Sequence, residues 1–268
     1  MQSPYNVIVI ENDPYALHMM GMLLARDWRT RIMDEIRGDE AAGDISKRIA
    51  KFTRDLVPID LVIIDSETPG EPQKPFLIAG LFQKMNPRPR LVFTATHSDP
   101  AFLKQAAALP DFAGYLLKHE VMFTLAEAAV RACLKSIVTT SGLEAALRQL
   151  FPTRDVQVMC SDDPFSALSA REKDIARLGI LYNMAEQELA DELLIEPGYV
   201  ANVMSTLYEI LGVHEIARGE RSPADFFEDP VILSKINRFL PGASPRRRAA
   251  NLPAIAFHLI TRQCLNNK

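Results

Sequence analysis

Six polar residues within the first 120 positions have side chains suited to phosphoryl transfer. In chain order they are Glu11, Asn12, Asp13, Asp65, Thr94 and Lys118. Carboxylates bind hard cations such as Mg²⁺ through their oxygens. A carboxylate beside such a cation can attack a phosphoryl donor, while the cation and a lysine neutralise the incoming oxygens. A threonine hydroxyl can then hydrogen-bond the new phosphoryl group. These residue types therefore favour a site at which a carboxylate accepts a phosphoryl group.

The residues stand at the ends of short apolar runs that alternate with helical patterns. The runs, which predict buried strands, cover residues 7–10, 60–65, 90–94 and 114–118. Helical patterns cover 14–24, 40–55, 74–86, 99–108 and 121–135, and residues 28–37 are expected to supply one more strand. This alternation predicts an α/β fold with a doubly wound parallel sheet. Because the carboxyl ends of parallel strands meet at one edge, the polar residues should converge there.

Three motifs surround these residues, namely IENDP at 10–14, DSETPG at 65–70 and GYLLK at 114–118. In this order and spacing, residues 5–135 resemble the flavodoxin-like receiver domain of two-component response regulators. The resemblance implies that Asp65 accepts a phosphoryl group from a histidine kinase. It also implies that Lys118 contacts that group and that Thr94 moves toward it. Tyr115 matches the aromatic side chain that swings inward on activation.

The resemblance also implies a Mg²⁺ site formed by Glu11, Asn12, Asp65 and the backbone carbonyl of Glu67. Receivers usually carry two adjacent acids where this chain has Glu11 and Asn12. An amide is a neutral ligand, so we expect Mg²⁺ to bind weakly and Asp65 to be phosphorylated more slowly than in a typical receiver. We expect Asp13 to cap the helix that follows it, in preference to binding the metal.

The pattern changes from alternating to all-helical after about residue 135. We expect a receiver at 1–135, a linker with a short helix at 136–165, a helix-turn-helix at 166–215 and a helical extension at 216–268. Helical patterns cover 142–151, 169–181, 185–193, 197–211, 223–240 and 252–265. Ser169 and Glu172 form a capping-box pattern, and Pro197 suits the first position of a helix. The apolar positions of the last helix predict packing on the helical domain or on a partner subunit.

Residues 166–213 resemble the LuxR/NarL-type output domain, with LSAREK at the start, ELADELLI in the middle and an LGV ending. In that family the second helix of the pair enters the major groove. Here residues 197–211 contain no Lys or Arg, and residues 168–213 contain three basic and eight acidic residues. A DNA duplex repels such a surface. The candidates for DNA contacts are Tyr199, Asn202, Ser205 and Thr206. For each of them the sequence fits an ordinary solvent-facing helix position at least as well.

The C-terminal segment has the opposite charge. Residues 214–268 contain nine basic and five acidic residues, including Arg246, Arg247 and Arg248. The arginine triplet could contact phosphates, or it could be a solvated loop after a Pro/Ser-rich break. The whole-chain net charge of −4 is therefore the result of cancellation between segments and by itself indicates no partner.

Composition narrows the class of protein. The 268 residues are 48% hydrophobic and 24% charged, as in globular domains. No apolar run approaches the roughly 18–20 residues that cross a bilayer, and the first residues do not resemble a secretory signal. Three separated cysteines predict neither a disulfide framework nor a zinc site, which favours a reducing cytoplasm. We expect no membrane partner and no enzymatic activity in the ordinary sense.

The combined expectation is a cytoplasmic response regulator that acts on transcription by binding double-stranded DNA, with a homodimer as its expected assembly. One alternative is that the acidic helix-turn-helix has lost DNA recognition and serves as a protein-interaction or dimerisation module. A third hypothesis is a receiver that works without phosphorylation as a fixed dimerisation platform.

Overall fold

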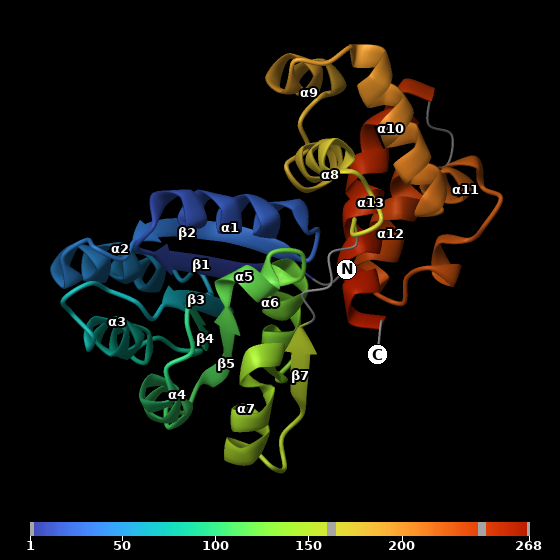
Figure 1. Ribbon diagram of the computed structural model, residues 1–268. Helices are drawn as coiled ribbons and strands as arrows, with labels where there is room; N and C mark the ends of the chain where they lie inside the picture. Colours follow the sequence, from blue (N-terminus) through green and yellow to red (C-terminus); the bar gives the residue numbers. More distant parts are fainter. Residues whose placement is uncertain (1–2, 160–164, 241–244, 267–268) are drawn as a thin grey trace. The chain divides into compact units, whose positions relative to one another are not determined.

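The computed structural model describes residues 3–159, 165–240 and 245–266 and divides into two compact units (Figure 1). The α/β unit contains residues 3–25 and 30–161. The helical unit contains residues 26–29 together with the chain from 162 onward. Within the described ranges, no helix combines the length and the apolar character needed to span a membrane.

The α/β unit is built on a seven-stranded parallel sheet in the order β2-β1-β3-β4-β5-β6-β7. The strands are β1 Tyr5–Glu11, β2 Thr30–Arg37, β3 Leu61–Asp65, β4 Arg90–Ala95, β5 Phe112–Leu117, β6 Ile137–Thr140 and β7 Val156–Met159. The predicted doubly wound parallel sheet is confirmed, including the strand expected at 28–37. The strand order reverses at β1, so the carboxyl ends of β1 and β3 border the crevice where such sheets bind ligands.

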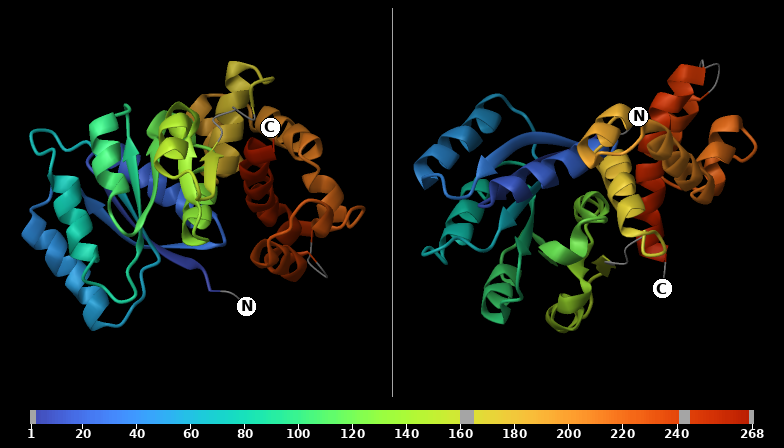
Figure 2. Two further views of the ribbon diagram at one scale, coloured as in Figure 1. Left: turned by 90° about the horizontal axis from the view of Figure 1, so that it is seen from below. Right: turned by 45° about the horizontal axis from the view of Figure 1, so that its top comes forward.

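Helices cover both faces of this sheet (Figures 1 and 2). One face carries α2 Ala42–Arg54, α3 Lys74–Phe82, α4 Pro100–Ala107 and α7 Glu144–Leu150, and the other carries α1 Pro14–Arg26 and α6 Leu125–Cys133. The first set buries Ile45, Phe82, Phe102 and Leu147 against the β-branched residues of the strands. Burial on both faces explains why β3 and β5 are buried along their whole length.

The segment expected to be a linker has a different structure. Its short helix is present as α7, preceded by a 3₁₀ turn at Ser141–Leu143, but residues 137–140 and 156–159 extend the sheet as β6 and β7. The physical reason lies in the run Ile137-Val138-Thr139-Thr140, whose four residues are β-branched and buried. The domain built on this sheet therefore extends well beyond residue 135.

The helical unit contains the expected helix-turn-helix and an ordered C-terminal extension. Its helices are α8 Ala170–Ala176, which continues into a π-helical turn at Arg177–Leu181, α9 Glu186–Leu193, α10 Pro197–Ile210, α11 Val213–Arg218, α12 Pro230–Phe239 and α13 Pro245–Asn266, with a 3₁₀ turn at Pro223–Asp225. Ser169 caps α8 through Glu172 as predicted, and Leu194 adopts a left-handed conformation at the turn between α9 and α10. Helix α13 packs against α11, α12 and the π-helical turn, so the extension is part of this unit's core.

A buried polar cluster lies inside the helical unit. The rings of Trp28 and His258 are 4.6 Å apart between centroids, and both nitrogens of His258 lack a hydrogen-bond partner in the described structure. Asp27 pairs with Arg29 at 2.7 Å, and its carboxylate lies 3.8 Å from Nδ1 of His258. Arg29 also lies 3.6 Å from Asp229. Ionisable groups are thus packed into the interior of this unit.

Candidate phosphoryl-acceptor site

The carboxyl edge of the sheet brings the predicted acids and the lysine together. Glu11 ends β1, Asp65 ends β3, and Lys118 follows β5 directly. The Lys118 ammonium lies 2.9 Å from Oε1 of Glu11 and 3.0 Å from Oδ1 of Asp65. Glu11 is fully buried and Asp65 is 4% exposed. The Lys118 ammonium therefore joins two acidic side chains at the carboxyl ends of β1 and β3.

Both carboxylate oxygens of Asp65 accept hydrogen bonds. Oδ1 accepts one from the backbone N–H of Glu67 at 3.1 Å, besides contacting Lys118. Oδ2 accepts one from the side-chain amide of Asn12 at 2.8 Å and a longer one from its backbone N–H at 3.4 Å. A phosphoryl donor that approaches Asp65 must therefore displace at least one of these donors.

Burial and charge separate the protonation states of the two acids. Burial is the main cause that raises the pKa of Glu11 to about 7, and its hydrogen bond with Asp65 adds to it. Burial also acts on Asp65, but the hydrogen bond with Glu11 and the Lys118 ammonium outweigh it and hold the pKa of Asp65 below its ordinary value. Burial opposes the charge of Lys118, yet both carboxylates keep its pKa above the ordinary lysine value. Asp65 is thus the more acidic of the pair and ionises first.

Asn12 and Asp13 occupy different roles at the start of α1. Oδ1 of Asp13 accepts the backbone N–H of Tyr15 at 2.8 Å, which confirms the predicted helix cap. The side-chain nitrogen of Asn12 instead points back into the site. It donates to Oδ2 of Asp65 and to the backbone carbonyl of Glu67, each at 2.8 Å, and lies 3.3 Å from Oγ1 of Thr68.

With the Asn12 amide nitrogen turned inward, the residues expected to bind Mg²⁺ do not fit a divalent cation, and Oε2 of Glu11 and Oδ1 of Asn12 are buried without a hydrogen-bond partner in the described structure. The two oxygens that should face the metal, on Asp65 and on the Glu67 backbone, both accept a hydrogen bond from the amide nitrogen of Asn12. An N–H group cannot be a metal ligand. Among the side chains that the structure describes, in residues 3–159, 165–240 and 251–261, no group of three from His, Cys, Asp or Glu is arranged to hold a metal ion.

The expected switch residues lie beside Asp65. Thr94 pairs with Asp65 across β3 and β4, and its hydroxyl is buried without a hydrogen-bond partner in the described structure. Tyr115 is 1% exposed, and its hydroxyl lies 3.4 Å from Oγ of Ser66. Ser66 also donates to the backbone carbonyl of Thr94 at 2.9 Å. The aromatic ring is therefore turned inward and connected to the residue next to Asp65.

Three contributions to the site are not evident from the sequence pattern. Ser66 links Thr94 to Tyr115. The carboxylate of Glu67 accepts the backbone N–H groups of Thr96 and His97, at 2.8 and 3.1 Å, and so anchors the loop after β4. Gly38 leaves room for Asn12, because a Cβ at Gly38 would lie 2.6 Å from Oδ1 of Asn12. Of these three, only Glu67 lies in a motif that was singled out in the sequence, the DSETPG turn, and that motif predicted a role for its backbone and not for its side chain.

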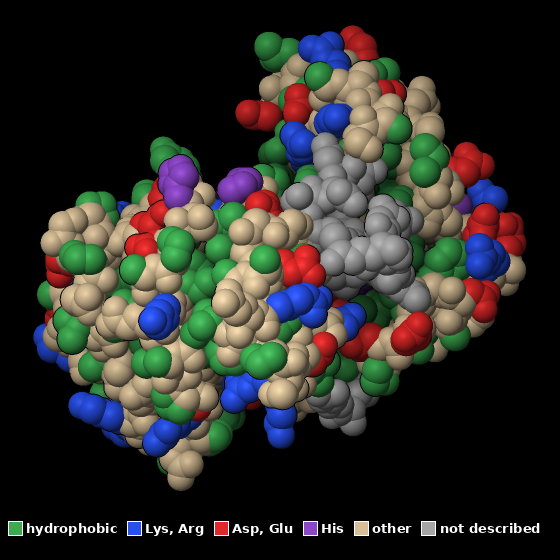
Figure 3. Space-filling view, turned by 60° about the horizontal axis from the view of Figure 1, so that its bottom comes forward, with side chains coloured by type: hydrophobic (Ala, Val, Ile, Leu, Met, Phe, Trp, Pro, Cys, Tyr) green, Lys and Arg blue, Asp and Glu red, His purple; other side chains and the backbone are tan. Residues whose placement is uncertain are grey.

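The candidate DNA-contacting residues of α10 are all on its solvent-exposed side. These are Tyr199, Asn202, Ser205 and Thr206. Arg246, Arg247 and Arg248 belong to the first turns of α13, and the structure describes their backbone but not their side chains. On the face drawn in Figure 3, Lys and Arg are dispersed among acidic, polar and apolar side chains.

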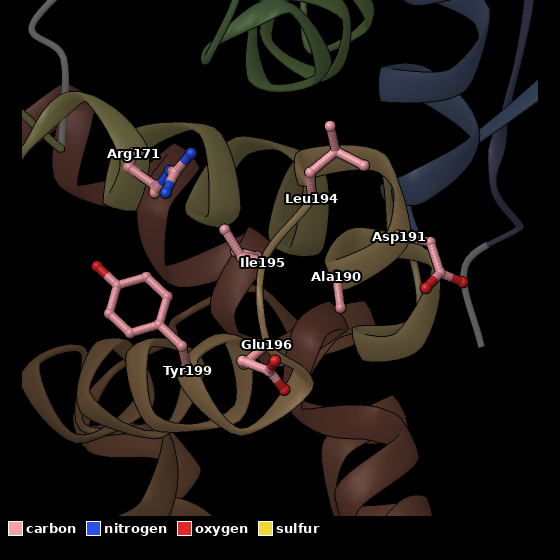
Figure 4. A pocket seen from close by; sticks show the side chains of 7 residues that line it. All are labelled: Arg171, Ala190, Asp191, Leu194, Ile195, Glu196 and Tyr199. Carbon is pink, nitrogen blue, oxygen red and sulfur yellow. The ribbon is translucent and has the colours of Figure 1, made fainter.

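A shallow pocket lies at the turn between α9 and α10 (Figure 4). Arg171 and Tyr199 lie toward one end of it, and Leu194 and Asp191 toward the other. Leu194 is 89% exposed, an unusual position for a leucine, and Glu196 also lines the pocket. This end of the helix-turn-helix therefore combines exposed apolar groups with carboxylates.

Neither a protein-family model nor a curated protein sequence matches this chain. The solved RcsB response regulator of Salmonella typhimurium is similar at 17% identity and a TM-score of 0.44, over 88% of this chain and 100% of that one. Response regulator ChrA of a heme-sensing two-component system is similar at 22% identity and a TM-score of 0.38, over 79% and 92%. An RcsB–DNA complex is similar at 16% identity and a TM-score of 0.45, over 87% and 98%. All three are response regulators. Over most of its length, the chain is similar to two-component response regulators.

Proposed function

We propose that this protein is a response regulator in which Asp65 accepts a phosphoryl group from a histidine kinase and the helix-turn-helix regulates transcription. The observation that carries the first half is the contact of one lysine with two buried acids at the carboxyl edge of the sheet. A carboxylate oxygen of Asp65 forms the new O–P bond, the N–P bond of the phosphohistidine breaks, and the histidine nitrogen keeps the electron pair. Lys118 neutralises the incoming phosphoryl oxygens.

Thr94 and Tyr115 transmit the change in this proposal. The Thr94 hydroxyl, which lacks a partner, hydrogen-bonds the new phosphoryl group. Its movement alters the Ser66 contact that holds Tyr115 inward. Phosphorylation then shifts a pre-existing equilibrium between two arrangements of the receiver and changes the formation of a homodimer.

The test of phosphoryl acceptance is labelling of the full chain with a small phosphodonor, followed by mass spectrometry. We expect one phosphoryl group on Asp65, added more slowly than in receivers with two adjacent acids, and none on Asp65→Asn. Lys118→Ala should slow labelling by about tenfold to a hundredfold, because one charge contact to the transferring oxygens is lost. Labelling that persists in Asp65→Asn would place the acceptor elsewhere.

The transcriptional half of the proposal rests on the geometry of α9 and α10. Two helices joined by a tight turn, with polar side chains along the outside of the second, are the arrangement that reads the major groove. Asn202 has the amide that can pair with adenine. A titration with duplex DNA at low salt should show binding that weakens steeply as salt rises. Absence of binding even to non-specific DNA at low salt would contradict this half.

A second candidate function is favoured by one observation, the acidity of the helix-turn-helix surface. Between residues 178 and 213 the chain has six acidic residues and no Lys or Arg. With Leu194 and Tyr199 exposed at the pocket, this surface suits a basic, partly apolar segment of a protein. Under this alternative, Leu194→Asp abolishes partner binding in a pull-down with the cognate kinase or with a second copy, while the DNA titration stays negative.

A further inference from the structure

We infer that the side-chain amide of Asn12 takes the place of a divalent cation in this receiver, so that Oδ2 of Asp65 and the Glu67 carbonyl are bound without metal. This inference deepens the phosphoryl-acceptor site of the proposed function. Three oxygen atoms surround the amide nitrogen. Two of them, Oδ2 of Asp65 and the carbonyl oxygen of Glu67, are acceptors only, and each lies 2.8 Å from that nitrogen.

These acceptors determine which end of the Asn12 amide faces Asp65 and Glu67. If the amide were turned over, its oxygen would face a carboxylate and a carbonyl oxygen, which is repulsive unless a cation lies between them. With the nitrogen inward, the two N–H groups are satisfied by the acceptors that a cation would otherwise require. The oxygen then faces Gly38, whose lack of a Cβ leaves the space that Oδ1 fills.

Lys118 offsets part of the negative charge of the site, and Oε2 of Glu11 is buried without a hydrogen-bond partner in the described structure. Lys118 lies within 3.0 Å of an oxygen of both Glu11 and Asp65. With the Asn12 amide on the second oxygen of Asp65, each oxygen of that carboxylate has a positively polarised partner. A divalent cation would have to displace the amide nitrogen, and Asn12 offers it no carboxylate in return. The cost of breaking these hydrogen bonds in a buried site opposes metal binding.

A single substitution tests this inference. Asn12→Asp replaces the donor amide by an isosteric carboxylate, which leaves the acceptors of Asp65 and Glu67 facing a third oxygen. Mn²⁺ is the probe, because it broadens the NMR signals of nearby amides and stands in for Mg²⁺. In the full chain, Mn²⁺ should cause no saturable broadening at Asn12, Asp65, Glu67 or Thr68. In Asn12→Asp, the same signals should broaden saturably, with an affinity at least about tenfold higher than in the wild type.

Two further measurements keep the test decisive. Mg²⁺ should raise the Tm of Asn12→Asp and leave that of the wild type unchanged, since a ligand stabilises only the protein that binds it. Asn237→Asp, at an exposed position of α12, adds the same charge elsewhere and should behave as the wild type. If Asn12→Asp does not fold, Asn12→Ala removes the donor without adding charge, and it should gain weak saturable Mn²⁺ broadening.

The outcomes separate the inference from the proposed function. Saturable Mn²⁺ binding by the wild type with the affinity of Asn12→Asp would overturn the inference, and so would absence of binding in both folded Asn12 variants. Asp65 labelling is a separate readout. A metal-binding Asn12→Asp that is not labelled on Asp65 would leave the inference intact and count against the phosphoryl-acceptor proposal.

Discussion

Replacing Gly114 by alanine is expected to lower the free energy of unfolding of the α/β unit by about 2–3 kcal/mol, because the added methyl overpacks a full interior. A Cβ at this position would lie 2.3 Å from the backbone oxygen of Val138 and 2.5 Å from its Cγ2. Gly114 pairs with Val138 where β5 meets β6, so the clash is with a backbone that cannot move alone. Urea denaturation followed by far-UV circular dichroism measures the loss.

Gly80→Ala is the matched control for this prediction. Gly80 lies within α3, and a Cβ there has no atom within 4 Å. The same chemical change should therefore stabilise the protein, by up to about 1 kcal/mol, through helix propensity alone. If both variants shift the urea midpoint equally, close approach of β6 is not the reason for the glycine at 114.

Acidification is expected to destabilise the helical unit through His258. The ring is buried, and burial lowers its pKa from 6.5 to about 4 against the attraction of Asp27. The unfolded chain binds a proton at this histidine more readily than the folded chain does. The contribution of the neutral His258 ring to the free energy of unfolding is therefore fully present above pH 6.5 and is lost as the pH falls toward 4. The loss is on the order of 3 kcal/mol at the acid end. The other charged groups that act on the ring are Arg29, Arg26 and Asp229.

The single tryptophan gives a local probe for this experiment. Trp28 is 4.6 Å from the His258 ring, so its fluorescence reports unfolding where the proton is taken up. His258→Phe keeps an aromatic ring that does not titrate and should flatten the stability profile between pH 6.5 and 4. His97→Gln, at a side chain that is 87% exposed, should leave the profile unchanged. A wild-type stability that is flat across this window would contradict the prediction.

Much of the fold and the position of the site follow from local sequence signals. Val7–Ile10 and Leu61–Ile64 are β-branched or leucine runs long enough only for buried strands, and the acids that follow them must then share one edge. Asp13 before Pro14 is a helix-start signal with few alternatives. These features depend on a few neighbouring residues, which is why the sequence alone predicts them.

Other features depend on contacts between distant residues. The positions of Asn12 and Asp65 at the ends of two strands predict that they lie close together, but not which end of the amide faces the carboxylate. That orientation decides whether Asn12 is a metal ligand or replaces the metal. The run Ile137–Thr140 is short and stands among helical patterns. Its pairing with β5 depends on Gly114, which lies 24 positions before its partner Val138. The membership of Trp28 in the helical unit has no local signal at all.

The two strands added after β5 also bear on how copies of this protein can associate. With β6 paired to it, β5 has no free backbone side, and the outer strands of the described sheet are β2 and β7. β7 has only four residues, while β2 carries charged side chains at Arg31, Asp34, Glu35 and Arg37. Short and charged outer strands resist pairing with another chain. Any homodimer is therefore expected to form through side chains on helices and loops. A high concentration of the protein should not make the sheets of neighbouring molecules pair edge to edge.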